Sequence, residues 1–276
     1  MNTIKSGRRI KTTIAAIITI PFIIPFLFLI STAVRTPRDY MSNPGGLPKS
    51  FTLGNIIGAW NQANLGQALV ATLITCIVAC TVCALVALAG AFWFRIHNGT
   101  GVNLLRWILV SAYAIPAVAW LIPVFVIFAN VGLTGNLLIV GLINGVSALP
   151  FGLYLVHTYF QQVLTPELLE AATLDGAGVY KTFRSIAIPL SMPALASTVA
   201  LVFVWTFGDL LVAATMLLAD PTVYTITLAT TSLTTREDVN LQGQAAAALV
   251  ALLPTIVVFA CAQKALAKGF GGVSDK

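Results

Sequence analysis

The hydrophobic positions of this chain fall into long continuous runs, and short polar segments separate these runs. An apolar run of roughly 20 residues is long enough to cross the hydrocarbon core of a bilayer as a helix. Six runs reach this length, and they cover residues 12–34, 64–94, 103–129, 136–160, 193–218 and 245–267. The pattern therefore predicts an all-α fold, namely a polytopic membrane helix bundle of six transmembrane helices that forms a single domain over residues 1–276.

The first run follows a basic start and contains two prolines. A basic start also opens a signal peptide, whose apolar region is shorter and precedes a small-residue cleavage site. The run over 12–34 is long enough to span a bilayer and lacks a clear cleavage site behind it, so we interpret it as a retained span. Because proline disturbs the preceding helical turn, we expect a kink near Pro21 and Pro25, and a break in the third span at Pro116 and Pro123.

Composition agrees with this interpretation. Hydrophobic residues make up 58% of the chain and charged residues 9%, and the mean hydropathy is +0.93. In soluble domains about a quarter of the residues are charged, so we interpret this chain as an integral membrane protein. The formal charge of +6 does not indicate a nucleic-acid partner, because the basic residues lie at the ends of the apolar runs, as topology signals do.

The basic residues also predict the orientation. Alternating spans place eleven lysines and arginines on one side: Lys5, Arg8, Arg9, Lys11, Arg95, Arg106, Lys181, Arg184, Lys264, Lys268 and Lys276. The other side receives four: Arg35, Arg38, Lys49 and Arg236. Since cytoplasmic loops carry the excess of basic residues, we predict that both termini and the segment around Glu170 face the cytoplasm.

Two other segments need interpretation. Residues 35–62 are rich in proline and glycine and end in aromatic residues suited to a membrane interface, so we predict a loop with one short surface helix. Cys76, Cys80 and Cys83 have the spacing of an iron–sulfur signature, but they lie inside a continuous apolar run. A cluster needs a chain that can wrap around the metal, so we interpret these cysteines as small packing residues on one helix.

The polar segment over 165–189 is the main interruption in the second half of the chain. Thr165 can cap a helix that begins at Pro166, and Glu167 lies where the helix dipole favours a carboxylate. Gly176 can adopt the left-handed conformation that ends a helix. We therefore predict a short helix up to Asp175-Gly176 that docks against another protein.

A second short helix is expected after this bend. It covers residues 177–185, and we predict that Pro189 and then Pro193 stop it. The alternative for the whole polar segment is an amphipathic helix that lies on the membrane surface, although few basic residues are present to favour lipid.

This segment resembles the cytoplasmic EAA signature of permease subunits of bacterial ABC importers. The match consists of Glu170-Ala171-Ala172, Asp175-Gly176-Ala177, Phe183-Arg184, Ile188-Pro189-Leu190 and Pro193. The chain is most similar to the sugar branch of that family, which includes the maltose permease. Asn130-Val131-Gly132-Leu133-Thr134-Gly135 and Leu149-Pro150-Phe151 resemble the same branch.

The resemblance implies a type I importer fold, with a first span over 12–34 and a permease core over 64–267. It also implies a subunit without catalytic activity that works with a second homologous permease subunit, two ATP-binding subunits and an extracytoplasmic solute-binding protein. The coupling role falls on Glu170, Ala171, Ala172, Leu174, Asp175, Gly176, Ala177 and Phe183. The chain has no phosphate-binding loop of the form G-x4-G-K-[ST]. We therefore expect no cofactor here, with ATP and Mg²⁺ bound by the partner ATPase.

The resemblance favours a carbohydrate, a disaccharide or oligosaccharide, as the transported solute. Sugar permeases often carry a W-N-E-F-like run in the fifth span, whereas this chain has Phe207-Gly208-Asp209-Leu210. A non-sugar solute such as glycerol-phosphate or a polyamine is therefore the alternative. An ion-coupled secondary transporter needs mid-membrane ion ligands and usually inverted repeats. An intramembrane enzyme needs a paired nucleophile and base. The sequence shows none of these features.

Polar residues within the spans are candidates for the substrate pathway. Asn144, Ser147 and Tyr154 have helical spacing that places them on one face of the fourth span. We predict that this face lines the pathway, with Thr206 opposite and Asp209 accepting a sugar hydroxyl. The alternatives are hydrogen bonds between packed spans, worth ~0.6 kcal/mol on average, or pairing of Asp209 with a companion subunit.

Aromatic and histidine residues add weaker signals. Tyr113, Trp120 and Trp205 can stack on sugar rings, although aromatic residues in spans more often serve packing. His97 and His157 have no sequence neighbours that suggest a metal site or a proton relay. We therefore expect structural or interfacial roles for both histidines.

Overall fold

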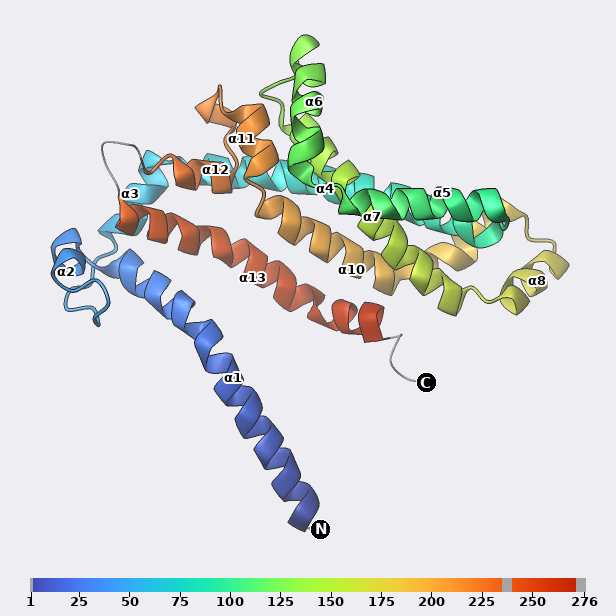
Figure 1. Ribbon diagram of the computed structural model, residues 1–276, viewed down its shortest axis with the longest axis horizontal. Helices are drawn as coiled ribbons and strands as arrows, with labels where there is room; N and C mark the ends of the chain where they lie inside the picture. Colours follow the sequence, from blue (N-terminus) through green and yellow to red (C-terminus); the bar gives the residue numbers. More distant parts are fainter. Residues whose placement is uncertain (1, 235–239, 272–276) are drawn as a thin grey trace. The chain divides into compact units, whose positions relative to one another are not determined.

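The computed structural model describes residues 2–234 and 240–271, with side chains for residues 18–234 and 240–263 (Figure 1). The described elements are α-helices with short 3₁₀ and π turns. The chain divides into two compact units, Met1–Gly66 with Ala229–Leu253, and Gln67–Leu228 with Pro254–Lys276. The single-domain organisation stays a prediction.

The first unit begins with a long helix. α1 (Asn2–Val34) continues without interruption through Pro21 and Pro25, and it packs against α3 (Gly54–Gln62). A short helix, α2 (Pro37–Ser42), lies between α1 and α3 in the sequence. The predicted loop over 35–62 therefore contains two helices where the sequence suggested one. The last helix, α13, covers Leu241–Gly271 and begins in this unit.

The remaining helices lie wholly or partly in the second unit. They are α4 (Leu65–Ile96), α5 (Thr100–Ser111), η1 (Ala112–Ala114), α6 (Ala117–Asn130), α7 (Leu137–Val163), α8 (Pro166–Leu174), α9 (Val179–Thr182), η2 (Phe183–Ala187), α10 (Ile188–Phe207), α11 (Leu211–Leu217), η3 (Pro221–Val223) and α12 (Ile226–Thr231). α7 contacts α5, α10 and α11, so it is the central helix of this unit.

Several helices are long and apolar enough to cross a membrane. They are Leu65–Ile96, Leu137–Val163, Val179–Phe207 and Leu241–Gln263, and the bent pair of α5 and α6 adds one more. In α1, the part with described side chains gives a shorter apolar helix over Ile18–Val34. The count of six spans and the cytoplasmic position of both termini stay predictions.

The break in the third predicted span lies at Pro116. The axes of the helices before and after it differ by 95°. Ile115 has extended backbone angles, as expected for a residue that precedes proline, and this ends the helical stretch at Ala114. Pro123, however, lies inside α6. The expectation of a second break at Pro123 was therefore wrong.

The prolines after the polar segment do not stop a helix, which corrects the prediction for residues 177–193. Pro189 lies in the first turn of α10 and Pro193 lies inside it. A π turn precedes them, in which the Ile188 N–H donates to the Phe183 carbonyl five residues back. This wider turn lets the helix continue where the Pro189 ring would otherwise meet the carbonyl four residues back.

The fifth predicted span also ends early. α10 stops at Phe207, and Gly208 and Asp209 separate it from the short helix α11. The predicted continuous span over 193–218 was therefore wrong at both ends, since the helical stretch begins at Val179 and ends at Phe207.

Glycines bring α7 and α4 into close contact. A Cβ atom on Gly145 would lie 2.8 Å from the Ala79 carbonyl oxygen, and one on Gly141 would lie 2.8 Å from the Thr75 carbonyl oxygen. Each distance is too short for a side chain, so the two backbones approach as closely as small residues permit. The sequence shows this signal as G-x3-G, which our prediction did not use.

The three clustered cysteines lie in this packed region of α4. The Cys76 Sγ is 3.9 Å from the Phe203 carbonyl oxygen, and the Cys80 Sγ is 3.5 Å from the Val199 carbonyl oxygen. Both carbonyls belong to α10, so these thiols contact a neighbouring helix. Among the described residues, no cluster of three metal-binding side chains occurs.

Candidate functional site

The polar segment begins with a capped helix. The Thr165 Oγ1 accepts a hydrogen bond from the Leu168 N–H at 3.4 Å, and Pro166 opens α8. Glu167 lies in the first turn, where hydrogen bonds from its own backbone N–H and from the Thr165 hydroxyl lower the pKa of its carboxyl group. The predicted N-terminal cap is confirmed.

α8 ends in a left-handed turn at Gly176. Gly176 has a φ of +73°. The Gly176 N–H donates to the Thr173 carbonyl at 3.0 Å, and the Ala177 N–H donates to the Ala172 carbonyl at 2.9 Å. This pair of bonds is a Schellman motif, which satisfies carbonyls that the helix end leaves free. Both ends of α8 are therefore fixed by local hydrogen bonds.

The residues assigned to coupling divide into two groups. One group is exposed and forms the free surface of the segment: Glu170, Ala171, Leu174, Asp175 and Gly176. The other group faces the chain itself, since Ala172 is buried, Ala177 is half-buried and the Phe183 ring lies 5.0 Å from the Phe92 ring. The segment therefore has an exposed tip and a base that packs on α4.

The base of the segment belongs to a hydrophobic core. Leu164 and Phe160 at the end of α7 are fully buried, and Leu168 of α8 packs against this core. α8 is thus held against both α4 and α7. A displacement of the tip would be transmitted to these two long helices, because packed helices move as rigid bodies.

A cavity of about 360 Å³ lies between the end of α4 and the helices α8 and α9. Arg95 and Glu170 both line this cavity. The Arg95 Nε is buried and has no hydrogen-bond partner among the described residues. The segment is therefore not fully packed against α4 on the side that carries Glu170.

Asp209 lies at the break after α10 and is held within the chain. Its Oδ1 accepts from the Val212 N–H at 3.2 Å, and its Oδ2 accepts from the Ala213 N–H at 3.0 Å, so it caps α11. The Asn144 Nδ2 of α7 donates to the same Oδ2 at 3.3 Å. Two predicted pathway residues are thus brought together, as partners of one another.

The other predicted pathway residues lie apart. Ser147 donates to the Ile143 carbonyl at 2.6 Å and lines a cavity of about 750 Å³ at the break between α5 and α6. Tyr154 is exposed and lines a different pocket of about 130 Å³. Thr206 is buried. Helical spacing therefore did not place these side chains in one cavity, and their role in transport stays a prediction.

Three aromatic side chains form a cluster beside the larger cavity. The Phe151 ring lies 4.9 Å from the Trp205 ring and 6.1 Å from the Tyr113 ring, and Tyr113 and Trp205 are 6.4 Å apart. Tyr113 and Trp205 are exposed, and Tyr113 lines the cavity together with Trp120. The sequence suggested Tyr113, Trp120 and Trp205, but it offered Phe151 only as part of the Leu149-Pro150-Phe151 motif.

His157 has a partner that its sequence neighbours did not reveal. The Arg106 Nη1 lies 2.8 Å from the His157 Nε2, across 51 residues of sequence. Arginine is always a donor, so the Nε2 accepts and the ring proton is on Nδ1, which faces the Ala91 carbonyl at 3.5 Å. The histidine therefore connects α7 with α5 and α4.

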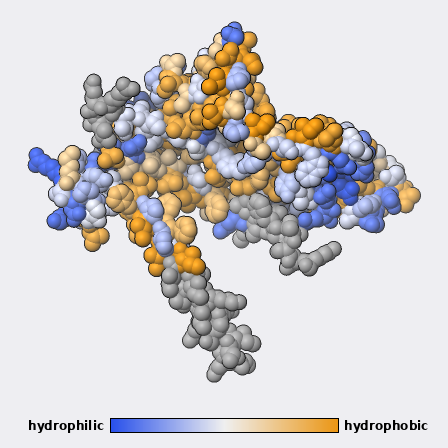
Figure 2. Space-filling view, viewed as in Figure 1, coloured by the Kyte–Doolittle hydropathy of each residue, from blue (hydrophilic) through white to orange (hydrophobic). Residues whose placement is uncertain are grey.

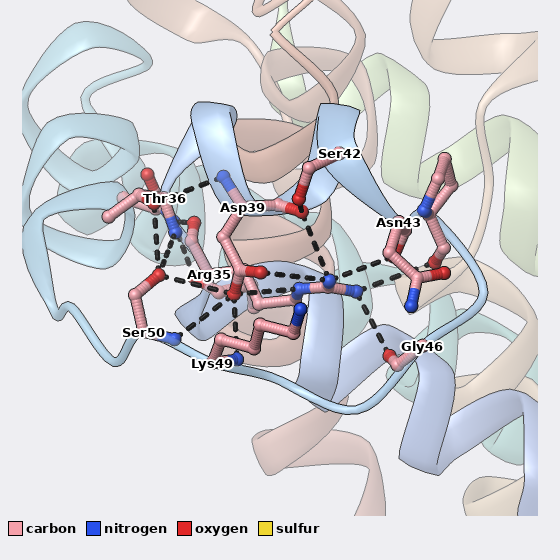
Figure 3. Close-up of polar contacts among 11 residues, drawn as sticks. Arg35, Thr36, Asp39, Ser42, Asn43, Gly46, Lys49 and Ser50 are labelled. Atoms are coloured by element: carbon pink, nitrogen blue, oxygen red, sulfur yellow. Dashed lines mark hydrogen bonds and ion pairs between the residues drawn. The ribbon is translucent and has the colours of Figure 1, made fainter.

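The first unit contains a polar cluster that sequence reasoning missed (Figure 3). Arg35 is buried although it lies in a predicted loop. Its Nε and Nη2 donate to the two carboxylate oxygens of Asp39 at 3.2 Å each. Its guanidinium also donates to the carbonyls of Asn43 and Gly46, at 2.8 and 3.1 Å.

Asp39 completes this cluster from the other side. Its Oδ2 accepts from the Lys49 and Ser50 N–H groups at 2.9 and 3.1 Å. The Arg35 guanidinium, helped by these N–H groups, holds the pKa of Asp39 well below its usual range. The loop over 35–50 is thus a fixed turn. The available sequence signal was an arginine four residues before an aspartate, at the start of a proline-initiated helix.

The fold and these features define a multi-pass membrane protein with a helix, α8, that is capped at both ends and exposed at its tip. The model of the family described as "Binding-protein-dependent transport system inner membrane component" matches residues 84–272. The chain belongs to this family. It is therefore a permease of the ABC importer class, located in the plasma membrane, and it works with other subunits and a binding protein.

Individual relatives cover almost the whole chain. The melibiose/raffinose/stachyose import permease protein MelC of Bacillus subtilis is 29% identical over 97% of this chain and 96% of its own length. The osmoprotective compounds uptake permease protein GgtD of Synechocystis sp. is 31% identical over 92% of this chain and 88% of its own length.

A solved structure shows the same fold. A bacterial ABC transporter involved in the import of the acidic polysaccharide alginate matches with a TM-score of 0.76, at 17% identity, over 96% of this chain and 98% of that chain.

Proposed function

We propose that this permease passes a carbohydrate across the plasma membrane and is driven by a separate ATPase that binds the exposed tip of α8. It works with a second homologous permease, two ATP-binding subunits and an extracytoplasmic solute-binding protein. This chain binds neither ATP nor Mg²⁺ and carries out no catalysis. The observation that carries the proposal is the geometry of α8, which is capped at both ends, packed at its base and exposed at its tip.

The surface of the tip supports a protein partner. Leu174 is 88% exposed, and Val179 and Tyr180 of the same segment are also exposed. Large apolar side chains grouped on a polar segment indicate a surface that another protein covers. Glu170 and Asp175 beside them add charges that a partner can pair with.

Leu174→Asp tests the coupling role. A carboxylate at this position cannot be buried in an interface without a partner, so we expect the ATPase to be lost during purification of the complex. Leu47 is the matched control, because it is a leucine of equal exposure, 87%, in the fixed turn of the other unit. Leu47→Asp should retain the ATPase. Retention of the ATPase by Leu174→Asp would overturn the proposal for the tip.

The aromatic cluster supports a carbohydrate. Exposed rings present flat apolar surfaces on which the C–H face of a sugar ring can pack. Relatives include permeases named for melibiose, raffinose and stachyose, for diacetylchitobiose and for alpha-glucosides. The structure favours a polyamine less. A polyamine is a cation that a carboxylate would bind, but the Asp209 carboxylate already accepts three hydrogen bonds from its own chain.

A second candidate solute is an osmoprotective compound. The Synechocystis relative is named for such compounds and is 31% identical to this chain. Uptake into proteoliposomes that contain the complete importer separates the candidates. We expect ATP-dependent uptake of a labelled disaccharide or trisaccharide, and uptake of a labelled non-sugar osmolyte alone would overturn the carbohydrate assignment.

Trp205 offers a sharper test within the same assay. Trp205→Ala should lower sugar uptake about tenfold, and Trp205→Phe should keep part of it, because an aromatic face is worth about 1 kcal/mol or more. Trp93 is the matched control, since it has the same exposure, 41% against 40%, but stacks on His97 outside the cluster. Equal loss in Trp93→Ala and Trp205→Ala would contradict a specific role for the cluster.

A further inference from the structure

A small pocket with a mainly apolar lining and a few polar groups lies between α5 and α7, apart from the coupling segment and from the aromatic cluster. Its volume is about 130 Å³. Its polar lining consists of Arg106, Trp107, Tyr154, His157, Thr158 and Gln161. No carboxylate of the described residues lines it, so the pocket carries a positive charge and several hydrogen-bond donors.

Arg106 is held in place in this pocket by His157. The bond to the His157 Nε2 uses one of the five N–H groups of the guanidinium. Because the His157 Nε2 accepts this bond, its ring is neutral, and the positive charge of the pair belongs to Arg106. The other N–H groups of Arg106 point to an anion as the ligand, since a guanidinium fork matches the oxygens of a phosphate.

The depth of the pocket in the membrane follows from α7. His157 lies six residues before the end of α7 at Val163. At 1.5 Å per residue, this places the pocket roughly 9 Å from the end of the helix, where the hydrocarbon gives way to headgroups. α8 follows directly, so the pocket is on the side that the basic residues predict to be cytoplasmic.

The surface next to the pocket is apolar. Leu104, Trp107 and Ile108 of α5 are 61%, 61% and 57% exposed, and Figure 2 shows hydrophobic side chains along α5 and α6. Acyl chains can cover such a surface, and tryptophan is favoured at the level of the headgroups. Basic pockets between helices on the cytoplasmic side are known to bind anionic headgroups.

We propose that this pocket binds the phosphate group of an anionic phospholipid of the cytoplasmic leaflet. Arg106 pairs with the phosphate, Tyr154, Thr158 and Gln161 donate hydrogen bonds to it, and the acyl chains lie along α5. The pocket is too small for the sugar that the permease transports. The proposal therefore does not depend on the identity of the solute.

The test uses the complete importer in nanodiscs of phosphatidylcholine and phosphatidylglycerol, with bound lipid counted by native mass spectrometry. Arg106→Gln should lower retention of phosphatidylglycerol about tenfold, because a hydrogen bond to a charged group is lost. Tyr154→Phe and Thr158→Val, which leave the bond between Arg106 and His157 intact, should lower it to a smaller extent. Arg184→Gln is the control, since this exposed arginine on the same predicted side does not line the pocket and should retain the lipid.

Two outcomes would overturn the proposal. The first is equal retention of phosphatidylglycerol by the wild type and Arg106→Gln. The second is binding of free phosphate. It is tested through the fluorescence of Trp107, which is the part of the signal that Trp107→Phe removes. Brominated phosphatidylglycerol should quench this part more than brominated phosphatidylcholine. If added inorganic phosphate abolishes this difference between the two lipids, the site binds free anions.

Discussion

Gly176→Val is the most direct perturbation of the coupling segment. Gly176 has a φ of +73°, and no atom lies within 4 Å of the position that a Cβ would take. Valine would therefore meet no steric clash with neighbours, and its effect would come from the backbone alone. A residue with a side chain in the left-handed region costs about 1–2 kcal/mol, and a β-branched residue is the least tolerated there.

This cost can be translated into a population. A penalty of 1–2 kcal/mol lowers the ratio of the native turn to alternative conformations by a factor of about 5–30. The change acts on the turn that orients the exposed tip of α8, while the packed base is untouched. We therefore expect ATP-driven uptake to fall several-fold to about thirtyfold, with normal insertion of the protein into the membrane.

Gly178→Val is the matched control two residues away. Gly178 also has no atom within 4 Å of a Cβ position, but its φ is −69° with an extended ψ of 168°, which suits valine. The two variants add the same side chain to the same segment and differ in the backbone conformation that they require. Gly178→Val should keep uptake near the wild-type value.

The assay compares solute uptake with ATP hydrolysis in proteoliposomes that contain the complete importer. Gly176→Val should uncouple hydrolysis from uptake or release the ATPase. Unchanged uptake with normal co-purification of the ATPase would refute the coupling role. An equal loss in both variants would show that the added bulk, rather than the left-handed turn, is responsible.

Three further predictions concern stability. Gly145→Leu should destabilise the protein by about 1–3 kcal/mol, because its Cβ would lie 2.8 Å from a backbone carbonyl of α4, whereas Gly101→Leu has open space; thermal unfolding in detergent compares the two. Asp209→Ala should cost about 0.5–2 kcal/mol through loss of the cap of α11, seen as a lower Tm, and an unchanged Tm would contradict the capping role. Arg35 lowers the pKa of Asp39 in the folded state. The contact of Arg35 with the Asp39 carboxylate therefore stabilises the fold fully above the unfolded pKa of about 4, and this stabilisation is lost only as the pH falls through the lowered pKa of the folded state. Wild-type hydrogen-exchange protection of the loop over 35–50 should therefore persist at pH 4, and Asp39→Asn should weaken it already at pH 6; equal exchange would contradict the argument.

Local signals in the sequence were sufficient for α8. Thr165, Pro166 and Gly176 act through hydrogen bonds and backbone preferences within a few residues, so the start and end of α8 could be predicted. Most of the helices that are long and apolar enough to cross a membrane were predictable for a similar reason, because length and apolar composition alone decide whether a helix can span a bilayer. The proline rule failed at Pro189, where a local π turn allows the helix to continue.

The partners of the polar side chains came only from the tertiary structure. Asn144 and Asp209 are 65 residues apart in sequence, and Arg106 and His157 are 51 apart. Helical spacing states which residues share a face of one helix, but it does not state which helix lies opposite. That choice depends on how the helices pack, and here glycines such as Gly145 let α7 and α4 approach closely. A polar residue within a span finds a partner on another helix only after this packing has formed, and for that reason the contact between Asn144 and Asp209 could not be predicted from the sequence.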